Sequence, residues 1–174
     1  MPQLIKNGAV TGDRWTLLRE VVAGSSLPAM PVIVPLATWL AARGELRARG
    51  DVGVWLCPAD DPASLGADAL ALPLIAVDFP KFADGRGYSI GRLLRERCSY
   101  TGELRAIGDI ARDQLYFLHQ VGFDAFMLRD GKDAQDALAS LHDFSDGYQQ
   151  TNRRAPWFRR SGVVGSASGT GSTP

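Results

Sequence analysis

Residues 72–98, "LPLIAVDFPKFADGRGYSIGRLLRERC", contain one complete strand-to-helix unit. The segment LPLIAVDF is apolar almost throughout, which is typical of a strand that is buried on both faces of a parallel sheet. The segment YSIGRLLRERC then places Ile90, Leu93 and Leu94 at helical spacing, with most of its arginines on the other side. A strand followed by a helix is the repeating unit of α/β folds, so this stretch predicts the fold class.

The same alternation continues on both sides of this unit. Apolar strands alternate with amphipathic helices, and this pattern favours right-handed crossovers and a mainly parallel sheet of about four strands flanked by helices. An open sheet and a half-barrel both satisfy the pattern. We favour the open sheet, because four strands cannot close a barrel within one chain. The predicted strands are 52–57, 72–79, 103–108 and 123–130, and the predicted helices after the last three are 88–98, 110–122 and 133–148.

The segment before these repeats has a different pattern. Asn7-Gly8 in "LIKNGAVTGDRWTLL" predicts a β-hairpin, because both residues tolerate the positive φ angles that a tight hairpin turn requires. We interpret "AGSSLPAMP" as a loop. Pro35 then fits the first turn of a helix, "PLATWLAARG".

The domain organisation follows from these patterns. We expect one α/β domain over 1–150, with the hairpin and first helix in 1–50 and the βα repeats in 51–150. Residues 151–174 are expected to form a tail that is first basic, "TNRRAPWFRR", and then rich in Gly and Ser. The basic, aromatic segment is interpreted as solvated, with contact to a protein partner as the alternative.

Composition restricts the classes of function. Of 174 residues, 45% are hydrophobic and 22% charged, and acidic and basic residues balance at 19 each, so no nucleic-acid or membrane partner is indicated. No apolar run is long enough to span a bilayer and the first residues lack the apolar core of a signal peptide, so we expect a cytoplasmic protein. Cys57 and Cys98 have no metal-type spacing, and no metal site is expected.

The carboxyl ends of the predicted strands carry the candidate site. Ligands of open parallel sheets bind in the crevice outside these ends, so the loops that follow them are considered together. The loop after Asp78 is the longest and the most charged. Asp78, Lys81 and Asp109 are the candidates for proton transfer. The candidate ligand-binding residues are Asp84, Gly85, Arg86, Gly87, Tyr88, Ser89, Arg105, Arg112, Asp113, Gln114 and Arg129.

This set of side chains suits a small anion. Arginine and lysine bind oxyanions, carboxylates orient them, and the N-terminus of the helix after Gly87 adds N–H donors. Each residue also has a purely structural interpretation, in which Asp84 and Asp109 cap helices and Arg105 forms an ion pair within the sheet. The "DGRG" segment is not a nucleotide-binding fingerprint, because the third glycine of that motif is missing.

Two sequence blocks resemble a known family. "DFPKFADGRGYSIGRLLRER" and "GELRAIGDIARDQLYFLHQVGFDAF" are similar to the bacterial family called domain of unknown function 934, over about residues 1–150. Members of that family are often labelled probable oxidoreductases of sulfite reduction, so the resemblance implies a role beside assimilatory sulfite reductase in sulfate-to-cysteine metabolism. The chain departs from the family pattern at Gly91, where a helix former such as alanine is usual, and at "CSYTG".

Three functions agree with these observations. The first is an accessory protein of sulfite reduction that binds a small anion or the reductase through the strand-end loops. The second is a small lyase or isomerase that acts on an anionic metabolite. The third is a non-catalytic interaction module, and a homo-oligomer agrees with any of them. The sequence has no flavin, nicotinamide, haem or iron–sulfur motif, so no cofactor is indicated.

Overall fold

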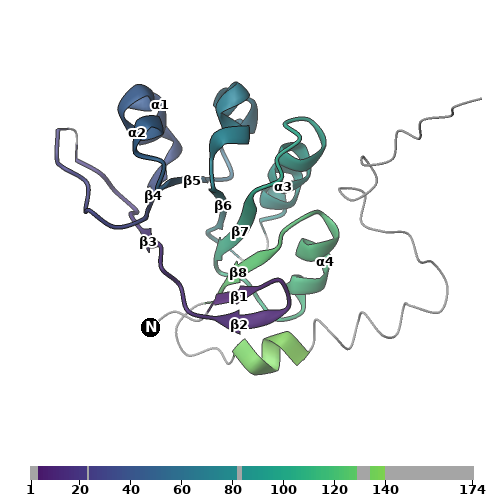
Figure 1. Ribbon diagram of the computed structural model, residues 1–174. Coiled ribbons are helices and arrows are strands. Elements are labelled where there is room, and N and C mark those ends of the chain that lie inside the picture. The colour runs from purple at the N-terminus through teal and green to yellow at the C-terminus, as the bar shows by residue number, and fades with distance from the viewer. Residues whose placement is uncertain (1–3, 23, 82–83, 129–133, 140–174) are drawn as a thin grey trace, which may run out of the picture.

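The computed structural model describes residues 4–22, 24–81, 84–128 and 134–139. Within this part of the chain, eight strands form one curled sheet and the helices form an arc around its outer side (Figure 1). The elements are β1 (Leu4–Lys6), β2 (Ala9–Thr11), β3 (Thr16–Leu17), β4 (Val32–Pro35), α1 (Leu36–Ala41), α2 (Arg43–Arg49), β5 (Val52–Leu56), η1 (Pro62–Ala71), β6 (Leu74–Phe79), α3 (Arg86–Glu96), β7 (Glu103–Gly108), α4 (Gln114–Gln120) and β8 (Ala125–Met127). Residues 134–139 are also helical.

The strand order explains why the helices share one face. The order is β2-β1-β8-β7-β6-β5-β4-β3, and every neighbouring pair from β3 to β8 is parallel. Successive strands therefore advance in one direction. Because each crossover between parallel strands is right-handed, every connecting helix lies on the same side. The opposite side becomes the concave inner face of a half-barrel.

A short connection shows how strongly the sheet curls. Residues 12–15, which we call the strap, join β2 at one edge of the sheet to β3 at the other edge. Five Cα–Cα steps link Thr11 to Thr16, so these residues are at most about 19 Å apart. In a flat sheet, eight strands spaced by about 4.8 Å would separate the two edges by about 34 Å. The strap is therefore compatible only with a curled sheet.

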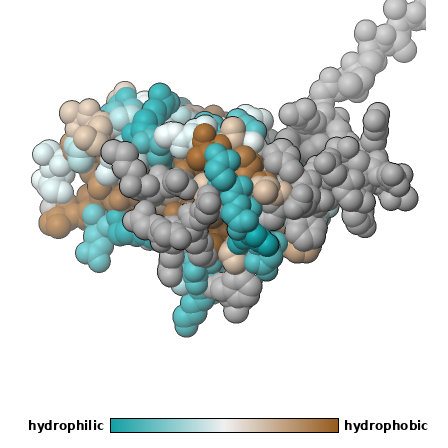
Figure 2. All heavy atoms as spheres, turned by 90° about the horizontal axis from the view of Figure 1, so that it is seen from below, coloured by the Kyte–Doolittle hydropathy of each residue, from teal (hydrophilic) through white to brown (hydrophobic). Residues whose placement is uncertain are grey.

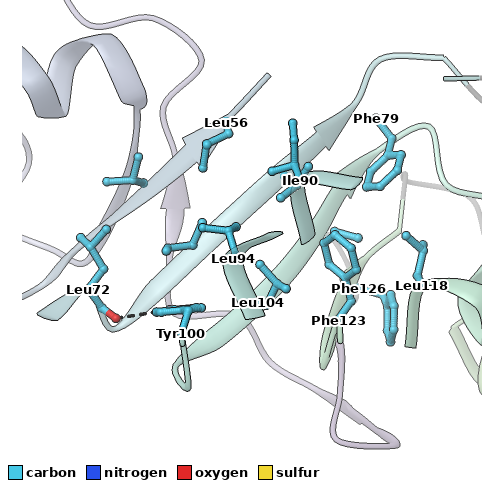
Figure 3. Close-up of a cluster of buried hydrophobic side chains, with 14 of the residues drawn as sticks. Leu56, Leu72, Phe79, Ile90, Leu94, Tyr100, Leu104, Leu118, Phe123 and Phe126 are labelled. Carbon is cyan, nitrogen blue, oxygen red and sulfur yellow. Dashed lines mark hydrogen bonds between the residues drawn. The ribbon is translucent and has the colours of Figure 1, made fainter. Parts of the chain in front are cut away.

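Each face of the sheet has its own hydrophobic cluster. The larger cluster lies between the sheet and the helices, and Figure 3 shows Phe79, Ile90, Leu94 and Phe123 in it. The smaller cluster on the inner face consists of buried Ile33, Leu74, Ala76 and Ile107, against which Trp15, Leu17, Trp55 and Met127 pack. Residues around the strap thus help to cover the inner face.

The predicted fold class is confirmed. The sheet is mainly parallel and flanked by helices, and β1 and β2 form an antiparallel hairpin around Asn7 and Gly8, whose φ angles are 51° and 76°. Of the two sheet forms considered, the half-barrel is the one found, and it contains eight strands instead of about four.

β1 and β2 are the predicted hairpin, and β3 and β4 are the strands that the sequence pattern did not predict. β4 is the run "VIVP", and β3 is only two residues long, too short for any periodicity to appear. Pro35 ends β4 and directly precedes α1, so it is not in the first turn of the helix as predicted. The predicted tail, residues 151–174, lies outside the described residues. No described helix has the length and apolar character required to cross a membrane.

Gly91→Ala is expected to lower the free energy of unfolding by up to about 2 kcal/mol. Alanine in a helix gains about 1 kcal/mol over glycine. However, a Cβ at residue 91 would lie 2.4 Å from a ring carbon of Phe123, which is 1% exposed, so the ring must move. Overpacking of this kind costs about 1–3 kcal/mol. Urea denaturation measures the net effect.

Gly44→Ala in α2 is the matched control, because nothing lies within 4 Å of the added Cβ. This variant should gain about 0.5–1 kcal/mol. A Gly91→Ala protein that is as stabilised as Gly44→Ala would contradict the predicted contact with Phe123.

His119 is expected to make stability fall at mildly acidic pH. Burial lowers the pKa of His119 below its ordinary value of 6.5. The unfolded chain therefore takes up the proton first as the pH falls below 6.5, and its free energy drops relative to the folded state. The contribution is fully present above the unfolded pKa and is lost as the pH falls toward the folded pKa. Urea denaturation between about pH 7.5 and 5 should show a smaller loss of stability in His119→Gln than in the wild type.

Candidate functional site

Asp78 lies at the carboxyl end of β6, on the inner face of the half-barrel. Its exposed fraction is 8%, and its Oδ1 lies 2.8 Å from Nη1 of Arg19, which follows β3. Oδ1 accepts no directed hydrogen bond from the described residues, so its contact with Arg19 is an ion pair. The Arg19 side chain remains 48% exposed, so part of its guanidinium is accessible to a ligand.

Trp55 supports this ion pair from β5. The Arg19 guanidinium carbon lies 5.4 Å from the centre of the Trp55 ring, a cation–π distance. The indole N–H of Trp55 donates a hydrogen bond to the carbonyl of Leu18 at 2.9 Å, which fixes the backbone next to Arg19. Three neighbouring segments of the inner face thus hold one half-exposed arginine. We call Arg19, Trp55 and Asp78 the upper cluster.

Arg19 and Trp55 were missed by the sequence prediction. Trp55 is paired with Ala76 in the register of β5 and β6, so strand alternation places it on the same face as Asp78. That signal was present in the sequence. Arg19 gave no comparable signal, because it follows a two-residue strand at the edge of the sheet, with β4 and β5 between that strand and β6.

Asp84 and Arg86 form a local pair at the start of α3. Nε of Arg86 donates to Oδ1 of Asp84 at 3.0 Å, Nη2 donates to Oδ2 at 2.8 Å, and the Arg86 N–H donates to Oδ1 at 3.2 Å. The arginine lowers the pKa of Asp84, and Asp84 in turn raises the pKa of Arg86.

The glycines and aromatics of this loop have packing roles. Gly87 is buried against Phe79, because a Cβ there would lie 2.5 Å from the ring. Tyr88 packs edge-to-face on the same ring, with centroids 5.5 Å apart, and burial raises the pKa of its hydroxyl. Gly85 and Ser89 are exposed at the start of α3. These contacts bring the loop to the carboxyl end of β6.

The two other proton-transfer candidates lie at the same edge. Lys81 is exposed, and its carbonyl accepts a hydrogen bond from the Asp84 N–H at 3.0 Å. The Asp109 N–H donates to the Phe79 carbonyl at 2.7 Å, so the ends of β6 and β7 are adjacent. Asp109 does not cap the next helix, because α4 begins at Gln114 and its N-cap residue is Asp113.

The remaining candidates lie around α4. Arg112 pairs with Asp136 at 2.8 Å, and both side chains are exposed. The Gln114 side chain accepts a hydrogen bond from the Ala111 N–H at 3.0 Å. These contacts tighten the turn before α4. Arg129 lies outside the described residues.

Arg105 is not brought together with the upper cluster. It is 1% exposed on the inner face, and its guanidinium bonds Asp13 at 2.6 Å and Glu103 at 2.7 Å, toward the amino-terminal ends of the strands. The structural interpretation, an ion-paired arginine within the sheet, describes this geometry.

In the described part of the chain, no group of three or more His, Cys, Asp and Glu side chains is arranged to hold a metal ion. The upper cluster therefore offers charge, hydrogen-bond donors and an aromatic face. Such a site can bind an anion through Arg19, with Asp78 as a neighbouring carboxylate that orients the guanidinium or accepts a proton.

Comparison with known proteins agrees with the resemblance of the two sequence blocks. No curated protein matches the chain. The family model described as "Bacterial protein of unknown function (DUF934)" matches residues 53–158. The matched region begins in β5, includes β6, α3, β7, α4 and β8, and extends through Phe158. The chain therefore belongs to the DUF934 family of bacterial proteins.

Proposed function

We propose that this protein binds a small oxyanion at the carboxyl edge of its half-barrel, as an accessory protein of assimilatory sulfite reduction. The observation that carries the binding function is Arg19, a half-exposed guanidinium held over Trp55 by the buried carboxylate of Asp78. The sulfur pathway is supported by the resemblance of the two sequence blocks alone. Sulfite and sulfate are the oxyanions to test first.

The charge arrangement supports an anion over a cation. Asp78 already has a cationic partner, and Asp84 is held by both Arg86 and its backbone N–H. The guanidinium of Arg19 has five N–H donors in a planar fork, more than one carboxylate oxygen can use. Lys81 is exposed at the same edge and adds positive charge there, whereas the charge of Arg86 is balanced by Asp84.

A direct binding test separates Arg19 from its structural role. Removing Arg19 alone leaves Asp78 buried without a partner, which is destabilising. The variant Arg19→Met/Asp78→Asn removes both charges together, so it should fold. Calorimetric titration with sulfite and with sulfate should show binding to the wild type and loss of it in this variant. Arg92→Met, which breaks an exposed pair with Glu96 on α3, is the control and should bind as the wild type does.

The pathway is tested by growth. A deletion strain should fail on sulfate and on sulfite and grow on sulfide, and the wild-type gene should restore growth. A folded Arg19→Met/Asp78→Asn protein should not restore it. Equal growth on all three sulfur sources would contradict the sulfur role while leaving oxyanion binding to be judged by titration.

A proton-transfer enzyme is the second candidate. It is favoured by Asp78, a buried carboxylate at a strand end, and by the Asp109–Phe79 backbone hydrogen bond that brings the next strand end beside it. Such an enzyme would turn over its anion, and Asp78→Asn would bind the anion without turnover. The third alternative is an interaction module that docks on a partner through an open sheet edge or the basic segment 151–160, and that segment lies outside the described part of the chain.

A further inference from the structure

A cavity of about 550 Å³ lies at the opposite end of the half-barrel from the upper cluster. Its walls are the strap, the β1–β2 hairpin and the starts of β6, β7 and β8, where Pro73, Glu103 and Asp124 lie. Cavities of about 300–1,000 Å³ are typical of small-molecule sites. Seen from below, the described surface shows hydrophilic and hydrophobic side chains next to each other (Figure 2).

The carboxylates of this cavity are already occupied by protein groups. Glu103 accepts from Arg105 through Oε1 at 2.8 Å and from Lys6 through Oε2 at 2.7 Å. Both oxygens of Asp13 accept from the Arg105 guanidinium, at 2.6 and 3.2 Å. Asp124 accepts from the Leu104 N–H and from Arg95, each at 2.9 Å. These acids therefore form a fixed floor and have little capacity for a cationic ligand.

Two cations of the cavity, Lys6 and Arg14, keep hydrogen-bond donors that the carboxylates of the cavity do not occupy. The Lys6 ammonium has three donors, and its side chain is 41% exposed while it bonds Glu103. Arg14 is exposed, and among the described residues it lies over the ring of Trp15, at 5.8 Å, and forms no ion pair. The cavity is lined by three carboxylates, those of Asp13, Glu103 and Asp124, and by the cations Lys6, Arg14 and Arg105. Arg95 does not line the cavity but pairs with Asp124, so the total is three carboxylates and four cations.

This balance defines the ligand class. The surplus is one positive charge, carried by Arg14 at the rim. A ligand with one negative charge neutralises this surplus, whereas a dianion would leave the cavity with a net negative charge. The half-buried ring of Trp15, with Leu4 and Pro73 in the same lining, offers an apolar surface for the body of the ligand.

We propose that this cavity binds a small monocarboxylate with a flat apolar body, held by Arg14 and Lys6 at its carboxylate and by the Trp15 ring at its body. The site is independent of the upper cluster, because the two lie at opposite ends of the strands and share no residue. The chain would then present two anion sites of different character, one of which is lined by the strap.

Benzoate is the probe, and the Trp15 indole N–H is the reporter. In ¹H–¹⁵N spectra the Trp15 signal is assigned by its loss in Trp15→Phe. Benzoate should shift this signal saturably, while benzyl alcohol and inorganic phosphate should bind more weakly. Arg14→Ala should weaken benzoate binding about tenfold, the effect of losing one hydrogen-bonded charge. Arg14→Lys, which keeps the charge, should recover part of it.

The Arg19→Met/Asp78→Asn variant is the matched control, because it alters the other end of the half-barrel. It should bind benzoate as the wild type does. Two results would overturn the proposal. One is an unshifted Trp15 signal at saturating benzoate in the wild type. The other is equal benzoate affinity in the wild type and in the Arg14→Ala protein. Arg14 is exposed, so this variant should fold as the wild type does.

Discussion

Arg105→Met is expected to lower the free energy of unfolding by about 3–5 kcal/mol, which is the range for breaking a buried ion pair from one side. Arg105 is 1% exposed, and the side chains of its partners Asp13 and Glu103 are each 8% exposed. The methionine fills much of the volume, so the cost comes from Asp13, which loses its cationic partner inside the protein, and from Glu103, which keeps only Lys6. Urea denaturation measures it as a lower midpoint.

Arg112→Met is the matched control for this measurement. Arg112 and Asp136 are 58% and 62% exposed, so their loss should cost at most about 1 kcal/mol. Adding Asp13→Asn to Arg105→Met removes the carboxylate that Arg105 had paired, so it should recover part of the stability. An Arg105→Met protein as stable as Arg112→Met would show that the buried network does not hold the sheet together.

Gly108→Ala is expected to lower the free energy of unfolding by about 2–4 kcal/mol and to weaken oxyanion binding. Gly108 ends β7 with a φ of 101°, a conformation that L-residues rarely adopt. An added Cβ would lie 2.5 Å from the Phe79 carbonyl oxygen and 2.9 Å from Oδ1 of Asp78. The first contact is with backbone and cannot be relieved by a rotamer change, and the second displaces the carboxylate that holds Arg19.

Gly85→Ala provides the comparison for Gly108→Ala. Gly85 has a φ of −75° and nothing within 4 Å of its added Cβ, so both stability and sulfite affinity should stay close to the wild type. Calorimetric titration and urea denaturation on the two variants test the pair of effects together. Normal sulfite affinity in a folded Gly108→Ala protein would argue that the position of Asp78 does not matter for binding.

The local elements of the fold were predictable, whereas the curl of the sheet was not. LPLIAV is a continuous apolar run and YSIGRLL has apolar residues at helical spacing, so strand β6 and helix α3 could be inferred without knowing their neighbours. The half-barrel depends on the pairing of β1 with β8, which joins residues more than 100 positions apart. No local pattern records such a pairing. The length of the strap limits it, but only once β2 and β3 are known to be the two edges.

The candidate site was also predictable only in part: Asp78 was identified from the sequence, and Arg19 was not. Asp78 was found because a charge at the end of an apolar strand is unusual, and strand ends converge in a parallel sheet. Arg105 is also a charge on an apolar strand, and only its contacts with Asp13 and Glu103 assign it to the floor of the other cavity. Arg19 reaches Asp78 from the edge strand β3, across β4 and β5. That proximity is a result of the curl.

The pairing of the first strand with the last also constrains how the protein is made. The β1–β2 hairpin needs only residues 4–11 and can form as soon as they leave the ribosome, but its place in the sheet does not exist until residues 125–127 have been synthesised. Until then Ile5, which is fully buried in the finished protein, has no core to enter. Contacts of such sequence separation slow folding. Within the described sheet, the hairpin is therefore synthesised before every other strand, and it is among the last elements to dock.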